Sequence, residues 1–288
     1  MDQERNQKMS FSIDGIAFQA REETDLRWLA PYGKVFYVFD QQSSGNLCFG
    51  VEGPYGKLFV KYAGARPVNF AGRPEDAIIT LQNAASLYQM ISHPALIPLL
   101  AHGPAGEGYA AIFAWRDAPV LCPTPPDFTI RDRVRRLQMA RSLKMLDMVY
   151  DLHAELSALG LVAVDFWDGN LLIDFERDEA IVCDIDLYRK RPAFNDRGRM
   201  KGSSRFLSPE EYTLGAALDE ATTVHAMGAL AFEFYGDNQE RKAESWFGPK
   251  ALFPVAKKAV SEDKEERYPS MRAFLNAWRE GVRHSWLR

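Results

Sequence analysis

Short apolar runs separated by turn-forming residues dominate the first third of the chain. Such runs occur at 34–39, 47–51 and 57–62, and the stretches between them are rich in Gly, Ser, Asn, Asp and Pro. A further apolar run at 108–114 predicts a buried strand, and the alternation around 11–13 indicates another strand near the N-terminus. This pattern predicts a β-rich region.

Helical spacing and one hairpin pattern follow. The stretch 74–91 opens with a proline and two acids, which suit the first turn of a helix. Apolar residues recur at helical spacing over about 130–159, which predicts one long helix. Apolar runs at 171–174 and 180–183 flank a charged turn and predict two paired strands. We therefore expect an α+β fold, with a β-rich first part and a mainly helical second part.

Composition and charge narrow the class of protein. The chain has 288 residues, of which 47% are hydrophobic and 26% charged, as in globular proteins that fold in water. The net charge of −4 gives no global field that would attract nucleic acid or a membrane surface. The three cysteines lack paired or metal-ligand spacing, and no apolar run approaches the roughly 18 residues of a membrane span. With no signal peptide visible at the start, we expect a cytoplasmic location.

The predicted hairpin carries the residues most suited to chemistry. Asp165 and Asn170 lie on a polar loop just before the strand 171–174, and Asp184 follows the strand 180–183. Because paired strands lie side by side, Asn170 and Asp184 can converge on one cation. Amide and carboxylate oxygens are the ligands that Mg²⁺ prefers. Asp165 would then lie in front of the metal and could accept a proton.

This arrangement resembles the catalytic loop and metal-binding motif of the protein kinase superfamily, whose pattern is His-Arg-Asp-x-x-x-x-Asn followed by Asp-Phe-Gly. A third motif adds to the resemblance, because the segment 202–210 ends in Ser-Pro-Glu where the family has Ala-Pro-Glu. The resemblance covers about residues 36–280. It implies a bilobal protein kinase-like fold with a β-rich N-lobe at 36–117 and a mainly helical C-lobe at 118–288. Residues 1–35 would be an N-terminal extension.

The resemblance also implies an activity, ATP and Mg²⁺ as cofactors, and roles for particular residues. The reaction would be transfer of the γ-phosphate of ATP to a Ser or Thr hydroxyl of a protein. Asp165 would be the catalytic base, Lys61 would hold the phosphates, and Asn170 and Asp184 would bind Mg²⁺. The nucleotide would be bound by Gly45, Leu47, Phe59, Lys61, Phe113, Ala114, Trp115, Asn170, Leu172 and Asp184.

The family pattern extends into the C-terminal part. Residues 219–232 resemble the central buried helix of the kinase second lobe, but Thr223 stands where an Asp normally braces the catalytic loop. The segments after residue 253 resemble the terminal kinase helices. There we expect Arg267 to pair with Glu210, because a buried charge needs a partner.

Within the catalytic loop the sequence departs from the family. Ala163 and Val164 replace the His and Arg, so the arginine that receives an activation-loop phosphate is absent. We therefore predict that loop phosphorylation is not the switch that activates the protein. Trp167 replaces a lysine that contacts the γ-phosphate. Asp168 is an additional acid, either a third metal contact or a turn former.

The predicted nucleotide site departs as well. Only Gly45 matches the glycine-rich loop of the family, and Phe59 stands where a small alanine lies over the adenine, which would narrow the pocket. No acid occupies the middle of the helix 74–91. Either Glu75 or Asp76 reaches Lys61 from the helix start, or this ion pair is absent.

Three classes of function follow from these features. The first is a Ser/Thr protein kinase with atypical motifs. The second is a pseudokinase that binds a partner, with or without nucleotide, and transfers no phosphate. The third is a small-molecule kinase of the aminoglycoside or choline type, which the Ser-Pro-Glu segment disfavours. The segment 189–205 is rich in Arg and Lys and could meet an acidic protein substrate or partner.

Overall fold

The structure is a computed structural model that describes residues 8–123 and 125–286. The chain divides into two compact units, the first formed by Met1–Ser92 and Ile97–Arg116, the second by His93–Leu96 and Asp117–Arg288. The class is α+β, with one five-stranded sheet and several helices. Within the described ranges no helix combines the length and apolar character needed to cross a membrane. The three cysteines, Cys48, Cys122 and Cys183, are free thiols.

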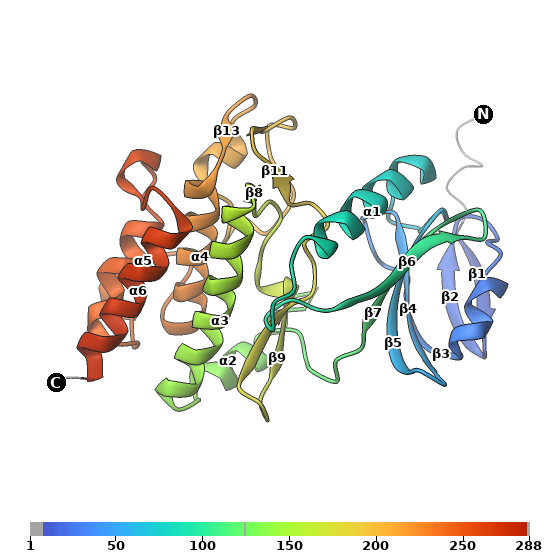
Figure 1. The fold of residues 1–288 in the computed structure, drawn as a ribbon, viewed down its shortest axis with the longest axis horizontal. Helices are drawn as coiled ribbons and strands as arrows, with labels where there is room; N and C mark the ends of the chain where they lie inside the picture. Colours follow the sequence, from blue (N-terminus) through green and yellow to red (C-terminus); the bar gives the residue numbers. More distant parts are fainter. Residues whose placement is uncertain (1–7, 124, 287–288) are drawn as a thin grey trace. The chain divides into compact units, whose positions relative to one another are not determined.

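The first unit is built on an antiparallel sheet in the order β3-β4-β5-β7-β6 (Figure 1). Turn-rich stretches end the apolar runs, so consecutive strands fold back on each other. Helix α1 packs against β5, β6 and β7 through buried side chains such as Leu81 and Tyr88. The elements are β3 (Lys34–Phe39), β4 (Asn46–Gly53), β5 (Gly56–Ala63), β6 (Leu99–Ala105), β7 (Gly108–Ala114) and α1 (Pro74–Gln89).

Much of the predicted N-terminal extension belongs to this unit's core. Strands β1 (Met9–Ile13) and β2 (Ile16–Ala20) form a hairpin, and a 3₁₀ helix, η2 (Arg27–Tyr32), follows. Their apolar side chains, including Phe18 and Leu29, join the buried cluster on one face of the sheet. The extension is thus a structural layer where it is described, while residues 1–7 of the predicted range lie outside the described residues.

The second unit is mainly helical and surrounds α4. Almost every residue of α4 is buried, because α2, α3, α5 and α6 all contact it (Figure 1). Its N-terminus is capped by Asp219, which accepts a hydrogen bond from the Ala221 N–H. The helices are α2 (Thr129–Arg135), α3 (Met139–Ala158), α4 (Glu220–Tyr235), α5 (Phe253–Ala259) and α6 (Met271–Trp286).

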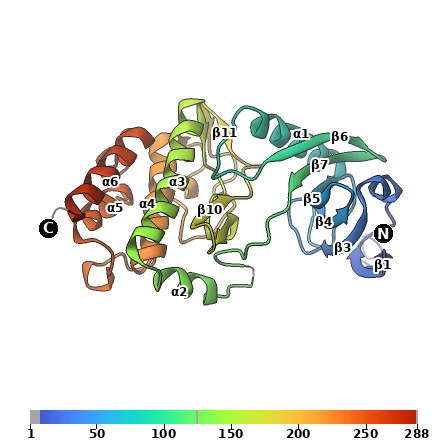
Figure 2. The same cartoon turned by 60° about the horizontal axis from the view of Figure 1, so that its bottom comes forward.

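The predicted single helix over 130–159 is wrong. Two helices, α2 and α3, meet at an angle, and Gln138 between them has extended backbone (Figure 2). Polar contacts hold α2, because Arg135 donates hydrogen bonds to the carbonyl oxygens of Glu233 and Gly236 at the end of α4. The apolar stripe that follows belongs to α3 alone, so α2 is held by polar contacts while α3 packs through apolar side chains.

Short elements complete the second unit. Three two-stranded ladders pair β8 with β11, β9 with β10 and β12 with β13. The strands are β8 (Leu161–Val162), β9 (Leu171–Asp174), β10 (Glu179–Val182), β11 (Arg189–Lys190), β12 (Ala193–Phe194) and β13 (Ala217–Leu218). The 3₁₀ helices are η3 (Asp168–Asn170), η4 (Pro209–Tyr212), η5 (Ala243–Ser245), η6 (Lys250–Leu252) and η7 (Lys264–Glu266).

Candidate functional site

A hydrogen bond to α4 holds the loop between β8 and β9. The Ala163 N–H donates a hydrogen bond to the Thr223 hydroxyl oxygen at 3.0 Å, and both residues are buried. Val162 and Val164 pack with Leu207 in an apolar cluster. A hydroxyl therefore holds this loop at the position where the family that the sequence resembles has a carboxylate.

The hairpin β9–β10 brings together three of the predicted site residues. The Asn170 amide donates hydrogen bonds to the carbonyl oxygens of Asp165 at 3.0 Å and Asp184 at 3.4 Å. The Cys183 N–H returns a bond to the Asn170 carbonyl oxygen at 2.9 Å. Leu172 lies in β9, where it pairs with Ile181 of β10. Asn170 and Asp184 therefore lie close together in the second unit, as the predicted pairing of the two strands requires.

The carboxyl group of Asp165 has an unusual environment. Burial, followed by the charge of Asp184, raises the pKa of Asp165 to about 7, although Lys201 opposes the shift. The backbone of Asp165 is left-handed, with φ at 65°, and this conformation is uncommon outside glycine. A carboxyl group with a pKa near neutrality suits general acid–base chemistry.

The donor set near Asp165 fits a hard cation. The charges of Asp184 and Asp186 both raise the pKa of Asp165, so negative charge accumulates around its carboxyl group. Because the amide nitrogen of Asn170 serves two carbonyl groups, its oxygen is the atom left for a ligand. Oxygen donors and excess negative charge are what Mg²⁺ prefers.

Gly202 brings the following segment next to this carboxylate. Its φ is +116°, and a Cβ added there would lie 3.2 Å from the Asp165 Oδ1 atom. A second close approach occurs inside the loop, where a Cβ on Gly169 would lie 2.2 Å from the Trp167 ring. The indole ring that replaces the family's lysine therefore covers the loop's own backbone.

Asp168 lies in the 3₁₀ turn η3, in agreement with the turn-forming alternative, and its side chain also forms a link that the sequence did not reveal. Its side chain is fully buried and accepts a hydrogen bond from Arg205 at 2.8 Å. Arg205 also binds Glu233 of α4 at 2.6 Å. Although burial alone would lower the pKa of Arg205, the hydrogen bond to Asp168 raises it. Asp168 therefore ties the segment 202–210 to the loop, a link that no local sequence signal marks.

The predicted pair between Glu210 and Arg267 is confirmed. Arg267 donates two hydrogen bonds to the Glu210 carboxylate, at 2.8 and 3.0 Å, and both side chains are buried. Burial alone would raise the pKa of Glu210, but Arg267 lowers it to about 2. Thr222 adds a third hydrogen bond to the same carboxylate. The pair fixes the end of the segment to the N-terminal part of α4.

In the first unit, Lys61 is only 5% exposed, and its ammonium lies 5.6 Å from the centre of the Phe113 ring. Phe113 and Ala114 lie in β7, and Gly45 lies in the turn before β4, against Phe70 and Ala77. Lys61 is therefore held inside the unit and does not point into bulk water.

The strand register places Leu47 and Lys61 on opposite faces of the sheet. Cys48 is the residue opposite Lys61 in the β4–β5 ladder, and residues directly opposite share a face. Leu47 belongs to the buried cluster on the other face. A shift of one position along a strand changes the face of the sheet.

Phe59 lies in an aromatic group, defined here as the rings of Phe36, Phe39, Phe59 and Trp115. The Phe59 ring is 5.5 Å from that of Phe39 and 6.4 Å from that of Trp115, and Trp115 contacts Phe36 at 4.9 Å. Residue 59 shares the face of Lys61, because the two are separated by one residue in β5. The bulk anticipated at residue 59 is thus part of a larger aromatic surface.

The acids at the start of α1 are exposed. Asp76 forms an ion pair with Arg73 at 2.8 Å, and the side chains of both are more than half exposed. Glu75 is exposed as well, whereas Lys61 is buried. The ionic partner that the structure gives Asp76 is thus Arg73.

Arginines of the basic segment 189–205 are largely engaged within the second unit. Arg189 and Arg197 contact Asp196, and Arg191 contacts Glu220. Arg205 is also paired, with Asp168 and Glu233, whereas Lys190 and Arg199 are exposed.

No protein-family model matches the chain, and no curated protein sequence matches it significantly.

Proposed function

We propose that this protein is a phosphotransferase with a bilobal protein kinase-like fold, which moves the γ-phosphate of ATP to a Ser or Thr hydroxyl of a protein. The observation that carries the proposal is the arrangement of Asp165, Asn170 and Asp184 around one amide group, with the Asp165 pKa at about 7. The Glu210–Arg267 pair adds support, because it ends a segment that resembles the kinase activation loop.

The residues divide the chemistry as follows. Asp165 accepts the proton of the attacking hydroxyl, whose oxygen forms the new bond to phosphorus while the bond to the β,γ-bridging oxygen breaks. Asn170 and Asp184 would hold Mg²⁺, which when bound neutralises charge on the phosphates. Lys61 would contact the phosphates. Asp168, through Arg205, keeps the segment 202–210 beside the base.

The decisive experiment measures phosphate transfer from γ-labelled ATP, to the protein itself and to a mixed protein substrate. We expect the Asp165→Asn variant to lose about 10²- to 10⁴-fold in rate, the usual contribution of a positioned base. Asp132→Asn is a matched control, because Asp132 is a half-exposed acid on α2. Equal rates for the wild type and Asp165→Asn would reject the proposal.

A pseudokinase is the second candidate, and two observations favour it. The aromatic group around Phe59 occupies the face of the sheet that carries Lys61. Trp167 also replaces a positive charge with a ring that covers Gly169. This candidate predicts binding of a partner without transfer, so an inactive wild type that still binds Mg·ATP would favour it.

A further inference from the structure

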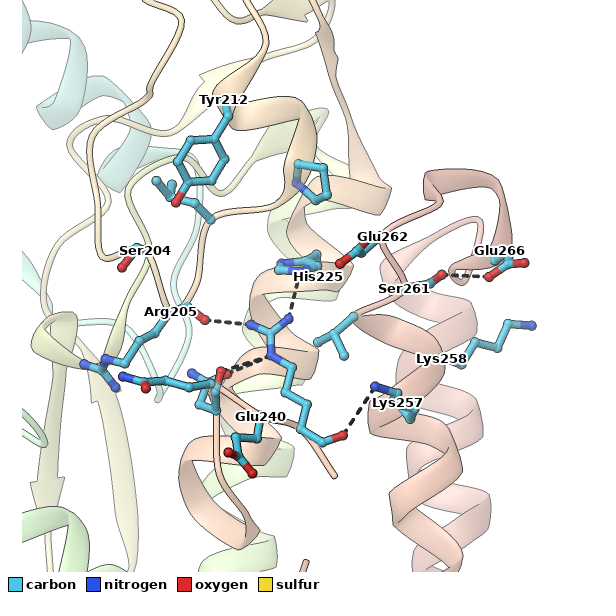
Figure 3. A pocket seen from close by; sticks show the side chains of 16 residues that line it. Ser204, Arg205, Tyr212, His225, Glu240, Lys257, Lys258, Ser261, Glu262 and Glu266 are labelled. Atoms are coloured by element: carbon cyan, nitrogen blue, oxygen red, sulfur yellow. Dashed lines mark hydrogen bonds between the residues drawn. The ribbon is translucent and has the colours of Figure 1, made fainter. Parts of the chain in front are cut away.

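A pocket of about 960 Å³ lies within the second unit, apart from the residues assigned to phosphate transfer (Figure 3). Its walls are the segment 204–212, His225 of α4, the residues 238–241 that follow α4, and α5 with the residues after it. In Figure 3, Arg205 and His225 lie on one side, while Lys257 comes from α5 on the other. A cavity of this size is at the upper end of the range for ligand sites.

Arg241 supplies a positive charge to this pocket, and its partners are all neutral. Its guanidinium donates hydrogen bonds to the Arg205 carbonyl oxygen at 2.8 Å and the Asn238 carbonyl oxygen at 3.1 Å. A third goes to the His225 Nε2 atom at 3.1 Å. Over residues 8–123 and 125–286, no carboxylate forms an ion pair with Arg241.

His225, which accepts a hydrogen bond from Arg241, is a neutral imidazole and does not balance the charge of the guanidinium. Its Nδ1 atom faces the Phe206 carbonyl oxygen at 3.2 Å, so Nδ1 carries the hydrogen and Nε2 accepts from Arg241. Burial, followed by the charge of Arg241, lowers the pKa of His225 to about 3. The ring is therefore neutral at physiological pH, and the guanidinium beside it stays uncompensated.

Holding Arg241 in this way has a cost in free energy. Burial, followed by repulsion from Arg267, lowers the pKa of Arg241 to about 10. Its backbone is also left-handed, with φ at 52°, and such strain outside glycine is often found at functional sites. By contrast, Arg205 and Arg267 both contact carboxylates. A partly buried cation without a counter-charge is favourable only when an anion joins it.

Other charges around the pocket limit what that anion can be. Lys257 binds the Arg241 carbonyl oxygen at 3.3 Å and adds positive charge. Glu240 pairs with Lys242, and Glu266 accepts a hydrogen bond from Ser261, so both acids have partners of their own. These acids would still repel a ligand that carries many negative charges. The pocket therefore suits one anionic group beside neutral or basic ones.

We propose that this pocket binds the anionic side chain of a polypeptide segment, namely Asp, Glu or a phosphorylated residue. A polypeptide can present one negative charge among neutral groups, which suits a pocket lined by both basic and acidic side chains. The wall formed by residues 204–212 also connects directly to the site, because Arg205 contacts Arg241 through its carbonyl and Asp168 through its side chain. The binding itself is independent of phosphate transfer, but its use as a docking point for a substrate rests on the proposed function.

The test uses acetylated pentapeptides Gly-Ala-X-Ala-Gly, in which X is Glu, phosphoserine or Gln, together with inorganic phosphate. Binding to the full ¹⁵N-labelled chain is followed by NMR through arginine Nε–H signals. We expect the Glu and phosphoserine peptides to shift the Arg241 signal saturably and the Gln peptide to leave it unchanged. Equal binding of the Gln peptide would reject an anion site. Binding of phosphate but of neither acidic peptide would reject the polypeptide.

Variants separate a specific site from a loss of folding. Arg241→Gln should weaken the Glu and phosphoserine peptides at least 10-fold, whereas Arg283→Gln, at an exposed position on α6, should not. Lys257→Gln should weaken peptide binding a few-fold, whereas Glu240→Gln should strengthen it. Misfolding would weaken binding in both variants and would not produce these opposite effects. Peptide affinity unaffected by Arg241→Gln would overturn the proposal. Asp165→Asn should bind as the wild type does, so failure of the transfer assay is distinguishable from failure here.

Discussion

At the residue scale, Asp165 combines a left-handed backbone with a carboxyl group that resists ionisation. Both properties follow from crowding, because Asn170 holds the Asp165 carbonyl while Gly202 approaches the side chain. Such a backbone costs about 1–3 kcal/mol and persists only when its surroundings hold it. The same packing that strains the residue also removes water from its carboxyl group.

The raised pKa of Asp165 predicts how stability and rate change with pH. The folded state binds this proton more tightly than the unfolded state, since the pKa is about 7 instead of the ordinary 3.8. The free energy of unfolding should therefore fall as the pH rises from 3.8 to about 7, by at most about 4 kcal/mol. The Asp165→Asn variant should lack this contribution to the pH dependence of stability. Urea unfolding at pH 5 and pH 8 measures the effect. A transfer rate that does not rise with pH up to about 7 would contradict the role of Asp165 as a base.

The buried pair of Arg267 and Glu210 makes a second prediction at this scale. Arg267→Met leaves the Glu210 carboxylate buried without its main partner, so we expect a loss of about 3–5 kcal/mol in the free energy of unfolding. In the wild type, the pKa of Glu210 at about 2 implies stability that is present above pH 4.5 and lost as pH falls toward 2. Chemical denaturation across pH 2–7 checks both statements. Arg272→Met, at a half-exposed position, is the control and should change stability little.

Sequence could identify individual charged residues only where a motif fixes their partners. The Glu210–Arg267 pair and the closeness of Asn170 to Asp184 were predicted because their spacing belongs to a pattern. The pairing of Asp168 with Arg205 was not, because the two lie 37 positions apart, in separate segments whose spacing does not specify which side chains meet. Long-range ion pairs of this kind depend on tertiary packing, which sequence spacing does not encode.

At the element scale, strands were predicted better than faces and helix ends. Turn residues mark where β3, β4 and β5 begin and end, so the hairpins follow from local chemistry. The face on which Leu47 lies depends on the register, because one step along a strand reverses the side chain's direction. The break between α2 and α3 was missed because it is caused by contacts of Arg131 and Arg135 with the end of α4.

The segment 202–210 gives a prediction about regulation. Arg205 already ties it to Asp168 and Glu233, and the Glu210–Arg267 pair holds its end. A phosphate on Ser203 or Ser204 therefore has no ordering left to provide. Ser203→Glu and Ser204→Glu should keep the transfer rate within a few-fold of the wild type, while Arg205→Met should increase hydrogen exchange across the segment. A large gain in rate from either glutamate, or from phosphorylation of these serines, would contradict this account.

At the scale of the whole molecule, several basic residues of one segment form ion pairs with acids that lie far away in the sequence. The net charge is −4, yet the Arg-rich segment 189–205 has no matching surplus of acids in its own sequence. The acids that balance it come from elsewhere in the second unit, among them Asp168, Glu220 and Glu233. Sequence counts do not show which of these charges meet after folding. The hydrogen-bond partners of Arg241 are neutral, and this residue lines the pocket.

Binding of Mg·ATP to the whole chain gives the last prediction. A ligand present at 100 times its Kd stabilises the folded state by about 2.7 kcal/mol, which should raise the melting temperature by about 5 °C or more. If Lys61 contacts the phosphates and Asp184 the metal, then Lys61→Met and Asp184→Asn should each reduce this shift, and EDTA should reduce it in the wild type. Lys57→Met is the matched control, because Lys57 also lies in β5 but is exposed. If the melting temperature is the same with and without Mg·ATP, the protein does not bind this nucleotide. The phosphotransferase proposal would then be rejected.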